Sequence, residues 1–453
     1  MADVNTKPTI ACHTLGCKVN RYETDAVLMR FLDAGFREVS FEESADVYLV
    51  NTCTVTGEAD RKTRQILRRA RSRNEAAVIA AMGCHVELGG AKELADVRIG
   101  CGDRSRIVEE VLSALAERTS TRLLVAHPDF TSVSDVFEEF GPVVRQSETR
   151  AYVKIQDGCD DFCSYCAIPF ARGRSRSRAR DSILSEARAL SAAGFAEVVL
   201  TGIHIGVYGR DLGEGPLALA ELVRELSAIE GIRRIRLGSL DPQSMSPAFI
   251  QALRGIPALC PHFHLSLQSG SAAVLTRMDR RYNPADFAVL VHLLREAFPE
   301  TGITTDVMTG FPGETESEHM ESLAFCEAMD FSRMHVFRYS RRPRTRAAAM
   351  PGQVPPEAAN RRAMEISALA ERMSTAFARR MDGKTREILI ETVGADGTGE
   401  GYTPEYVHVS VRNLQPSGKG CIVPCRLLFS DGVTLEGLPL ADGRTDVSQN
   451  PAS

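Results

Sequence analysis

The sequence predicts an α/β protein with three folded regions: an N-terminal parallel α/β domain, a partial barrel of six β/α units, and a small C-terminal all-β barrel. Three observations predict this class. Strand and helix patterns alternate in the first region, six more strand patterns alternate with helices in the second, and the third contains strand patterns alone. We expect domains at residues 8–118, 151–382 and 383–442, a linker at 119–150, and a disordered tail at 443–453.

The first region alternates short apolar runs with helical periods. Residues 24–34, for example, place apolar side chains on one helical face. Strands that alternate with helices at this spacing predict a parallel sheet with helices packed on it. The expected strands are 9–14, 46–50 and 77–81, and the expected helices are 24–34, 60–74 and 106–117.

The second region repeats the strand–helix pattern. Six such units in one parallel array predict a partial (β/α)6 version of the TIM barrel, or a closely related open sheet. A long helix is expected at 356–381. The expected strands are 152–156, 197–200, 232–237, 262–267, 302–308 and 333–338, and the helices are 182–193, 217–228, 247–253, 284–297 and 316–329.

The third region changes to strand signals separated by glycines. A short all-β module of this size predicts a small barrel. The expected strands are 387–392, 406–411, 420–429 and 434–438. We assign the turns to Gly394, Gly397, Gly399, Gly401 and Gly432.

Composition limits the class of protein. Apolar residues make up 43% of the chain and charged residues 25%, as in ordinary globular proteins. No apolar run approaches the ~20 residues that span a bilayer, and the first residues lack signal-peptide features, so we expect a cytoplasmic protein without a membrane partner. The net charge of −5 gives no global nucleic-acid footprint, but local basic stretches occur at 61–73, 172–180 and 333–346.

Three of the twelve cysteines stand in a Cys-x3-Cys-x2-Cys motif directly after the first strand of the second region. Cys159, Cys163 and Cys166 can bind three irons of a [4Fe–4S] cubane and leave the fourth iron open to S-adenosylmethionine (SAM). A zinc site or structural thiols are the alternative. Zinc sites usually have four ligands in paired spacing, however, and no fourth Cys or His lies nearby on the same loop.

Glycines and polar residues follow the later strands of the second region. In barrels of this type the ligand binds at the carboxyl ends of the strands. The candidate SAM-binding residues are Gly202, His204, Ser239, Ser266, Gln268, Asp306, Gly310 and Glu314.

A second set of cysteines follows three predicted strands of the first region. Cys17, Cys53 and Cys84 would converge at the carboxyl edge of a parallel sheet, where three thiolates can hold a second cluster. The alternative is that they are inert buried cysteines. We interpret the remaining six as core or incidental: Cys12, Cys101, Cys260, Cys326, Cys421 and Cys425.

These motifs together resemble the methylthiotransferase family of radical SAM enzymes over nearly the whole chain. The strings around the cysteines carry the resemblance: Gly16-Cys17, Asn51-Thr52-Cys53, Gly83-Cys84, and Cys159-Asp160-Asp161-Phe162-Cys163-Ser164-Tyr165-Cys166. The C-terminal module resembles the TRAM domain of the family. Three strings resemble the MtaB type in particular: Gly16-Cys17-Lys18-Val19-Asn20-Arg21-Tyr22-Glu23-Thr24, Asn51-Thr52-Cys53-Thr54-Val55-Thr56 and Thr201-Gly202-Ile203-His204-Ile205-Gly206.

The resemblance implies a tRNA-modifying enzyme with two [4Fe–4S] clusters and SAM, the auxiliary cluster being held by Cys17, Cys53 and Cys84. It implies transfer of a methylthio group to C2 of N6-threonylcarbamoyladenosine at position 37 of tRNA. The implied partners are the tRNA anticodon stem-loop, an electron donor such as flavodoxin or ferredoxin, and a sulfur donor. Sibling types act on isopentenyladenosine or on a ribosomal-protein aspartate. One departure is the run 341–346, where the family has a loop with fewer arginines.

Two further features bear on RNA binding. The alternating residues Arg172, Arg174, Arg176, Arg178 and Arg180 are candidate RNA contacts, with a solvated surface run as the alternative. Tyr402 and Tyr406 can stack on bases, although strand tyrosines more often pack. A non-catalytic iron–sulfur scaffold that binds RNA is the remaining alternative to an enzyme.

Overall fold

The computed structural model describes residues 7–117, 135–414, 418–429 and 435–440. The tail expected at 443–453, and residues 119–134 of the expected linker, lie outside these ranges. The chain forms two compact units. Unit 1 comprises residues 1–146, 156–178 and 340–348, and unit 2 comprises 147–155, 179–339 and 349–453.

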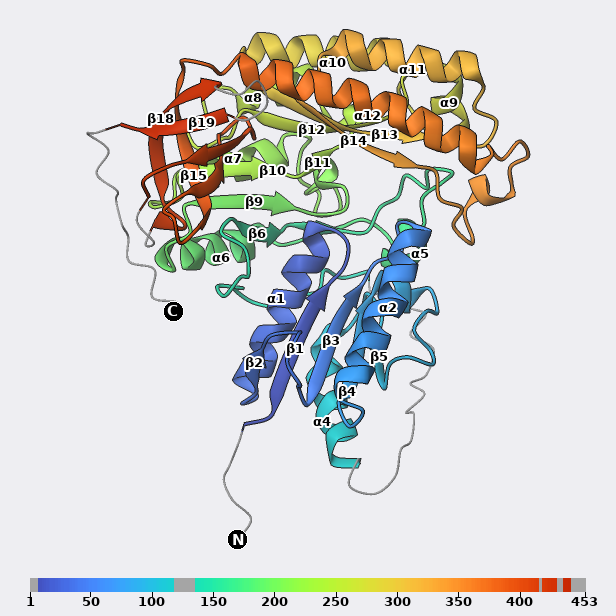
Figure 1. Ribbon diagram of the computed structural model, residues 1–453, viewed down its shortest axis with the longest axis vertical. Coiled ribbons are helices and arrows are strands. Elements are labelled where there is room, and N and C mark those ends of the chain that lie inside the picture. The colour runs from blue at the N-terminus through green and yellow to red at the C-terminus, as the bar shows by residue number, and fades with distance from the viewer. Residues whose placement is uncertain (1–6, 118–134, 415–417, 430–434, 441–453) are drawn as a thin grey trace. The chain divides into compact units, whose positions relative to one another are not determined.

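Unit 1 is built on a five-stranded parallel sheet of order β2-β1-β3-β4-β5 (Figure 1). The three predicted strands form its centre. Two outer strands of three residues each were missed, because so short a run carries no period. The strands are β1 (Thr9–Thr14), β2 (Arg37–Val39), β3 (Val47–Thr52), β4 (Val78–Gly83) and β5 (Val97–Ile99).

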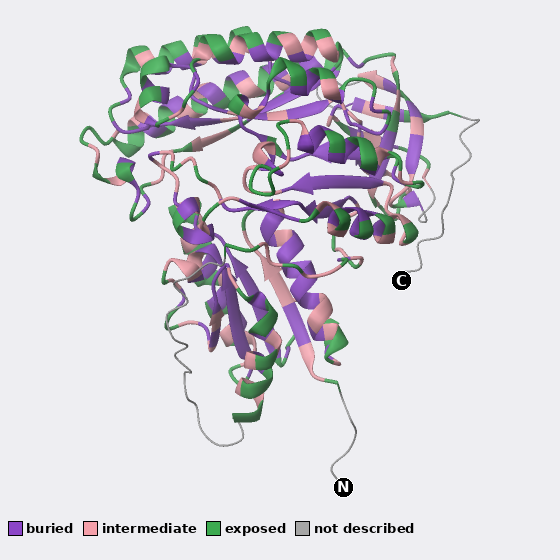
Figure 2. Ribbon diagram, turned by 180° about the vertical axis from the view of Figure 1, so that it is seen from behind, coloured by how far each residue is buried: buried purple, intermediate pink, exposed green. Residues whose placement is uncertain are grey.

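Helices cover both faces of this sheet. Val47 and Leu49 of β3 pack in the core beneath α1 and α4, whereas Tyr48 and Val50 point to the opposite face and pack beneath α2. The strands are therefore buried on both sides, as Figure 2 shows. For this reason their sequences are nearly continuous apolar runs. The helices are α1 (Lys18–Asp33), α2 (Gly57–Arg73), α3 (Cys84–Glu87), α4 (Ile107–Glu117) and α5 (Ile168–Arg172).

Unit 2 begins with the predicted array of parallel strands. One ladder has the order β10-β9-β6 and a second has the order β11-β12-β13-β14, and every pairing in them is parallel. This confirms the partial (β/α)6 barrel. The strands are β6 (Ala151–Lys154), β9 (Glu197–Thr201), β10 (Arg234–Leu237), β11 (Ser239–Leu240), β12 (His262–Gln268), β13 (Gly302–Thr309) and β14 (Arg333–Arg338).

Helices of unit 2 follow the strands as expected. Capping boxes at Asn283 and Thr315 start α10 and α11 at the predicted residues. The helices are α6 (Arg180–Ala192), α7 (Ala218–Ser227), α8 (Pro247–Leu253), α9 (Ala272–Arg277), α10 (Pro284–Ala297), α11 (Glu316–Met329) and α12 (Pro356–Arg379). Among the described residues, no helix is long and apolar enough to cross a bilayer.

The C-terminal part of unit 2 is a closed barrel of order β15-β16-β17-β19-β18, which confirms the predicted small all-β barrel. The turn assignment of Gly399 and Gly401 was wrong, because both lie in β16. A Cβ atom at Gly401 would lie 2.2 Å from the carbonyl oxygen of Leu389, so a side chain does not fit there. The strands are β15 (Thr385–Val393), β16 (Gly399–Tyr402), β17 (His408–Val411), β18 (Ile422–Phe429) and β19 (Leu435–Pro439).

A buried ion cluster joins this barrel to the parallel strands. Arg236 on β10 donates to Glu197 on β9 at 2.8 Å and to the carbonyl oxygen of Pro404 at 3.0 Å. Arg234 donates to the carbonyl oxygen of Tyr402 at 3.2 Å. Burial raises the pKa of Glu197, but Arg236 and Arg234 outweigh burial and the pKa is lowered. The carboxylate therefore stays ionised inside the protein.

The two candidate base-stacking tyrosines belong to the same junction. The rings of Tyr402 and Tyr406 stack on each other with centroids 4.7 Å apart. The guanidinium of Arg150 lies 5.1 Å from the Tyr406 ring, and that of Arg236 lies 4.8 Å from it. The packing interpretation of these tyrosines is therefore correct, and their faces are occupied within the protein.

Candidate active site

The Cys159 loop belongs to unit 1 and is closed by a short antiparallel pair, β7 (Gln156–Asp157) with β8 (Arg176–Ser177). The backbone N–H of Cys159 donates to the carbonyl oxygen of Gly173 at 3.1 Å, and that of Cys166 donates to Cys163 at 3.0 Å. These bonds fold the motif into a compact loop on which all three cysteines are partly exposed.

The glycine before the motif is required by this fold. Gly158 has a φ of +70°, and a Cβ atom there would lie 1.8 Å from the carbonyl oxygen of Arg174. Burial raises the pKa of the Cys159 thiol, and the neighbouring thiols of Cys166 and Cys163 raise it further. The three thiols therefore stand on one compact loop and influence one another electrostatically, and this donor set fits an iron–sulfur cluster.

Cys17, Cys53 and Cys84 converge at the carboxyl edge of the unit 1 sheet. Each follows one of the adjacent strands β1, β3 and β4. Burial raises the pKa of the Cys53 thiol to about 12, and the thiols of Cys84 and Cys17 add to that rise. All three are free thiols, so the predicted convergence exists and the donor set fits a cluster.

Close backbone packing explains the glycines beside these cysteines. A Cβ atom at Gly16 would lie 2.9 Å from the sulfur of Cys53. At Gly83, where φ is +96°, it would lie 2.4 Å from the Asn51 side chain and 2.7 Å from the carbonyl oxygen of Thr52. Only glycine permits this approach of the strand ends.

Arg172, the last residue of α5, contacts this second cysteine set. Its Nε donates to the sulfur of Cys84 at 3.2 Å, and Nη2 donates to Asn20 at 2.7 Å. Its guanidinium forms a bidentate pair with Glu23 at 2.9 and 3.0 Å and a further contact with Asp157 at 3.0 Å. Arg172 and both carboxylates are fully or almost fully buried.

The RNA-contact prediction was wrong for Arg172, Arg176 and Arg178. Their side chains are at most 4% exposed and form ion pairs with acidic residues of unit 1. Arg180, in unit 2, pairs with three glutamates of its own unit. Of the five, Arg174 alone has a well-exposed side chain, at 69%, and it pairs with Asp160. Buried guanidinium groups cannot reach phosphates.

A fourth thiol, that of Cys101, lies beside Cys84. The sequence analysis interpreted Cys101 as a core or incidental residue. The Cys101 thiol donates a hydrogen bond to the Cys84 sulfur, with the two sulfur atoms 3.8 Å apart. This hydrogen bond lowers the pKa of Cys84 to about 6, and Arg172 also lowers it, against the opposing effect of burial. Cys84 is thus held as a thiolate, the form that binds metal. The role of Cys101 could have been indicated only by the position of this residue, which follows the short strand β5.

Most of the candidate SAM-binding residues lie at or just after the carboxyl ends of unit 2 strands, and their contact with SAM stays a prediction. Gly202 and His204 follow β9, Ser239 starts β11, Ser266 and Gln268 end β12, Asp306 lies in β13, and Gly310 and Glu314 follow β13. The buried Oε1 atom of Gln268 has no hydrogen-bond partner among the residues described. An orphaned buried acceptor of this kind fits a polar ligand.

Two of these residues instead build the loop after β13. Glu314 is buried, accepts from the backbone N–H of Gly310 at 2.7 Å and pairs with Arg362 at 2.8 Å. A Cβ atom at Gly310 would lie 2.6 Å from the Cβ of Ala359 on α12. The Oε2 atom of Glu314 accepts both of these hydrogen bonds and so ties the loop to α12, and a SAM contact by Glu314 stays a prediction.

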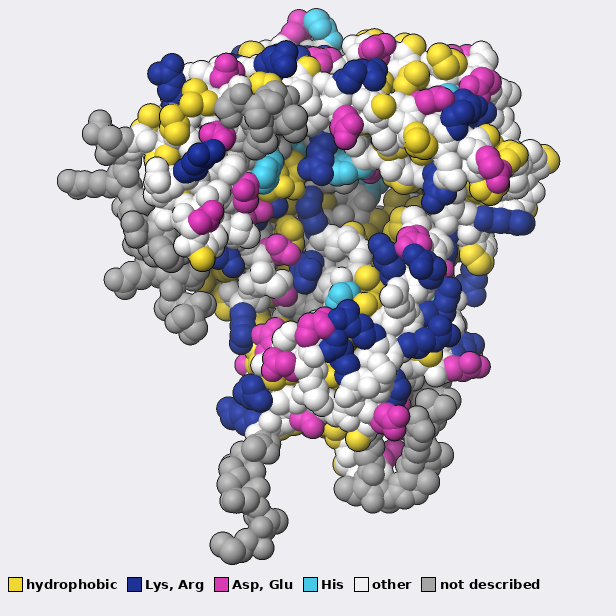
Figure 3. Space-filling model, viewed as in Figure 1, with side chains coloured by type: hydrophobic (Ala, Val, Ile, Leu, Met, Phe, Trp, Pro, Cys, Tyr) yellow, Lys and Arg dark blue, Asp and Glu magenta, His cyan; other side chains and the backbone are white. Residues whose placement is uncertain are grey.

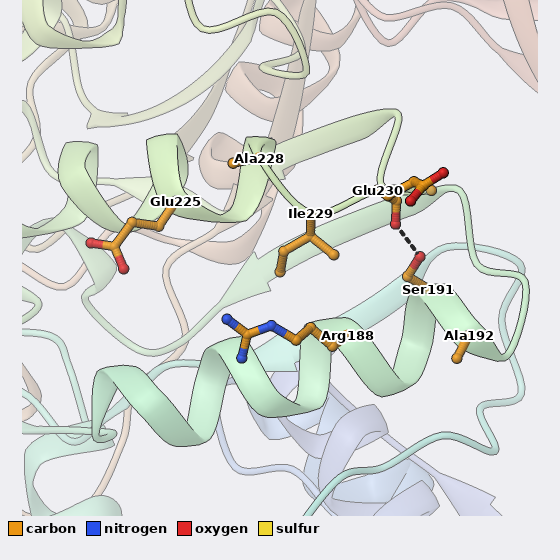
Figure 4. Close-up of a pocket in the computed structure, with 8 residues that line it drawn as sticks. Arg188, Ser191, Ala192, Glu225, Ala228, Ile229 and Glu230 are labelled. Atoms are coloured by element: carbon orange, nitrogen blue, oxygen red, sulfur yellow. Dashed lines mark hydrogen bonds between the residues drawn. The ribbon is translucent and has the colours of Figure 1, made fainter.

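A pocket of 620 Å³ in unit 2 lies away from these strand ends (Figure 4). It is formed by Arg188, Ser191 and Ala192 of α6 and by Glu225 and the residues after α7. The C-terminal ends of these helices lead into the amino ends of the next strands. The pocket therefore lies at the face of the barrel where structural residues, and not catalytic ones, are expected.

Comparison with known proteins identifies the family. The profile of "Uncharacterized protein family UPF0004" matches residues 9–99, and that of the radical SAM superfamily matches residues 153–326. The chain is 38% identical over 416 residues to the threonylcarbamoyladenosine tRNA methylthiotransferase MtaB of Bacillus subtilis, covering 90% of this chain and 91% of the relative. The chain belongs to the methylthiotransferase family of radical SAM enzymes, in its MtaB branch.

Other relatives place the chain within this family. The MtaB protein of Thermotoga maritima is 36% identical over 94% of this chain and 98% of its own length. A tRNA-2-methylthio-N(6)-dimethylallyladenosine synthase of Caldicellulosiruptor saccharolyticus is 34% identical over 83% of this chain and 81% of its own length. The radical SAM methyltransferase TsrM of Kitasatospora setae has a similar fold, with a TM-score of 0.55 at 15% identity, covering 87% of this chain and 81% of TsrM.

Proposed function

We propose that this radical SAM methylthiotransferase modifies tRNA, replacing the C2 hydrogen of N6-threonylcarbamoyladenosine at position 37 with a methylthio group. The names of the MtaB relatives support this substrate. Two [4Fe–4S] clusters would be held by Cys159, Cys163 and Cys166 and by Cys17, Cys53 and Cys84.

The observation that carries the proposal is the position of α5 in unit 1. The helix begins two residues after Cys166, and its last residue, Arg172, donates to the sulfur of Cys84. Five helical residues span about 7.5 Å at 1.5 Å per residue. Two sets of three free thiols thus lie at the two ends of one short helix, a spacing that suits a radical formed at one set and sulfur supplied at the other.

The chain's own residues have separable roles in this proposal. When bound, the cluster at Cys159, Cys163 and Cys166 supplies the electron that cleaves SAM. Gln268 offers its unpartnered Oε1 atom to a polar group of SAM at the strand ends. Arg172 and Cys101 donate hydrogen bonds to Cys84 and thereby fix the orientation of this ligand.

Further partners follow from the same chemistry. Reductive cleavage of SAM requires an electron donor such as flavodoxin or ferredoxin, and each turnover consumes one sulfur atom from a donor. The closed C-terminal barrel would act as a TRAM domain on the RNA. We further propose that the anticodon stem-loop is the part of tRNA recognised, since an unpaired loop presents an adenine that side chains can reach.

The test is nucleoside mass spectrometry after anaerobic incubation with tRNA containing threonylcarbamoyladenosine, SAM, sulfide and reductant. Gain of one methylthio group in place of one hydrogen is the expected result. Release of 5′-deoxyadenosine without this product, together with product on isopentenyladenosine tRNA or on the ribosomal protein, would overturn the substrate. No SAM cleavage at all would overturn the enzymatic proposal in favour of a scaffold.

Three alanine variants separate the two cysteine sets. Cys163→Ala should abolish 5′-deoxyadenosine release, whereas Cys53→Ala should keep that release and lose methylthio product. Cys12→Ala is the matched control, because Cys12 is a free thiol on β1 outside both sets and should leave both products unchanged. Methylthio product from the Cys53 variant would contradict the role of the second set.

A further inference from the structure

The solvent-facing side of α2 presents an unbalanced basic surface. Residues Gly57–Arg73 contain seven basic and two acidic residues, in a chain whose net charge is −5. Thr63, Leu67 and Ala70 are buried against the sheet, so the opposite face of the helix points to solvent. Figure 3 shows Lys and Arg side chains gathered over this helix.

The cations of α2 fall into two groups. In the first group, Arg69 and Arg73 pair with Glu42, and Arg71 pairs with Asp96. Their charges are therefore neutralised within unit 1, and these arginines present little net charge to a partner.

In the second group, Arg61, Arg64 and Arg68 are all exposed and lie on the solvent face at positions i, i+3 and i+7. Arg61 pairs with Glu58, but Arg64 and Arg68 have no ion pair within the described part of the chain. Because Arg64 and Arg68 are four residues apart, their like charges repel each other on the helix. A bound polyanion would remove that repulsion.

A second segment adds to the same surface. Ser340 accepts from the backbone N–H of Gly57 at 2.8 Å, and Arg342 pairs with Asp60 at 2.6 Å, so the segment packs on the first turn of α2. Arg341 and Arg344 flank the buried Arg342 and are exposed, with no ion pair among the described residues. This is the arginine-rich run that departs from the family pattern.

The surface starts beside the second cysteine set. The helix begins four residues after Cys53, and Asp60 in its first turn lies 2.9 Å from His85, the residue after Cys84. Arg61 is the next residue, and the exposed arginines continue along the helix from there. A polyanion lying on α2 would therefore reach the edge of the sheet where the thiols converge.

We infer that this arginine surface, defined by Arg61, Arg64, Arg68, Arg341 and Arg344, binds the phosphate backbone of the RNA substrate. The inference rests on the proposed function and adds the face by which unit 1 holds tRNA. Arginine predominates over lysine there, and its planar guanidinium binds phosphate oxygens with two parallel hydrogen bonds. An acidic protein, such as an electron donor, is the other class of partner that the charge would attract.

The experiment compares the intact protein with the double variants Arg64→Gln/Arg68→Gln and Arg341→Gln/Arg344→Gln. Binding to tRNA containing threonylcarbamoyladenosine is measured at several salt concentrations. Loss of two phosphate contacts should weaken binding about tenfold near 0.1 M salt and make the log–log salt dependence about 1.5 less steep. KM for tRNA should rise while kcat stays within about twofold.

Arg37→Gln is the matched control, because Arg37 is exposed on β2 at the amino edge of the same sheet. Unchanged tRNA affinity and salt dependence in both double variants would overturn the inference. Unchanged tRNA binding with slower reduction by flavodoxin would assign the surface to an acidic protein instead. Failure of the proposed function is distinguished because wild-type protein would then form no methylthio product on tRNA containing threonylcarbamoyladenosine.

Discussion

Arg172→Met tests whether the arginine after the Cys159 loop is structural. The substitution keeps an unbranched apolar stem but removes the bidentate pair with Glu23, the contact with Asp157 and the hydrogen bond to Cys84. Removing one partner of a buried ion pair costs about 3–5 kcal/mol, because the remaining charge is left without compensation. The same substitution at Arg174 should cost at most about 1 kcal/mol, since its pair with Asp160 is exposed.

The structure places the Arg172 effect at the lower end of that range. Glu23 keeps Arg104 at 3.1 Å, and Asp157 keeps Arg176 at 3.2 Å, so neither carboxylate is left alone. We expect a loss of about 3 kcal/mol in the local opening free energy of α5, which corresponds to roughly hundredfold faster amide exchange there.

Hydrogen exchange followed by mass spectrometry is the assay, because it resolves α5 from the rest of the chain. Peptides covering residues 168–178 should exchange faster in Arg172→Met and at the wild-type rate in Arg174→Met. Iron content should fall with Arg172→Met, since Cys84 loses a donor. The reasoning is refuted if both variants exchange alike and Arg172→Met binds tRNA more weakly, because that result would mean that Arg172 faces RNA.

Three further outcomes are expected. Gly83→Ala should lose the iron of one cluster. Gly35→Ala is the control and should lose stability alone, because Gly35 has a similar φ of +93° but nothing lies within 4 Å of its Cβ position. Equal iron contents in the two variants would contradict this prediction. Cys101→Ala should lower the reduction potential of the cluster proposed at Cys17, Cys53 and Cys84, as followed by an EPR titration, because a hydrogen bond to sulfur is lost. Cys326→Ala should leave this potential unchanged. Glu197→Gln should destabilise unit 2 at pH 7, and its difference from wild type should shrink as pH falls below the unfolded pKa near 4.3. Stability that comes from a lowered pKa is present above the unfolded pKa and is lost as pH falls through the folded pKa. A pH-independent difference in thermal unfolding would exclude the ion pair as the cause of the destabilisation.

Local signals predicted five helices of the parallel-strand region to within two residues, whereas the short helix α9 was not predicted. The capping boxes at Asn283 and Thr315 mark helix starts in the sequence itself. In contrast, α1 begins at Lys18, six residues before its predicted start, because its first turns bury polar side chains. Asn20 and Glu23 interrupt the apolar period, and the reason is their bonding to Arg172, which is 149 or more residues away.

The same long-range pairing explains the error over the arginine run. Five arginines at alternate positions between residues 172 and 180 have the pattern of a solvated surface. Their burial depends on acidic partners such as Glu23 and Glu139, and nothing near the run in sequence indicates that pairing. By contrast, the convergence of Cys17, Cys53 and Cys84 followed from topology alone, since parallel strands deliver their carboxyl ends to one edge.

The buried network around Arg172 also constrains how the two cysteine sets are related. Both sets belong to unit 1, and α5 joins the Cys166 loop to the Cys84 thiolate through one guanidinium group. Because Arg172 also binds α1 through Glu23 and the base of the loop through Asp157, the C-terminal end of α5 cannot shift without breaking a buried ion pair. The separation between the sets is therefore fixed by the packing of unit 1. A substrate base that reaches both sets must adapt to a distance that the protein holds constant.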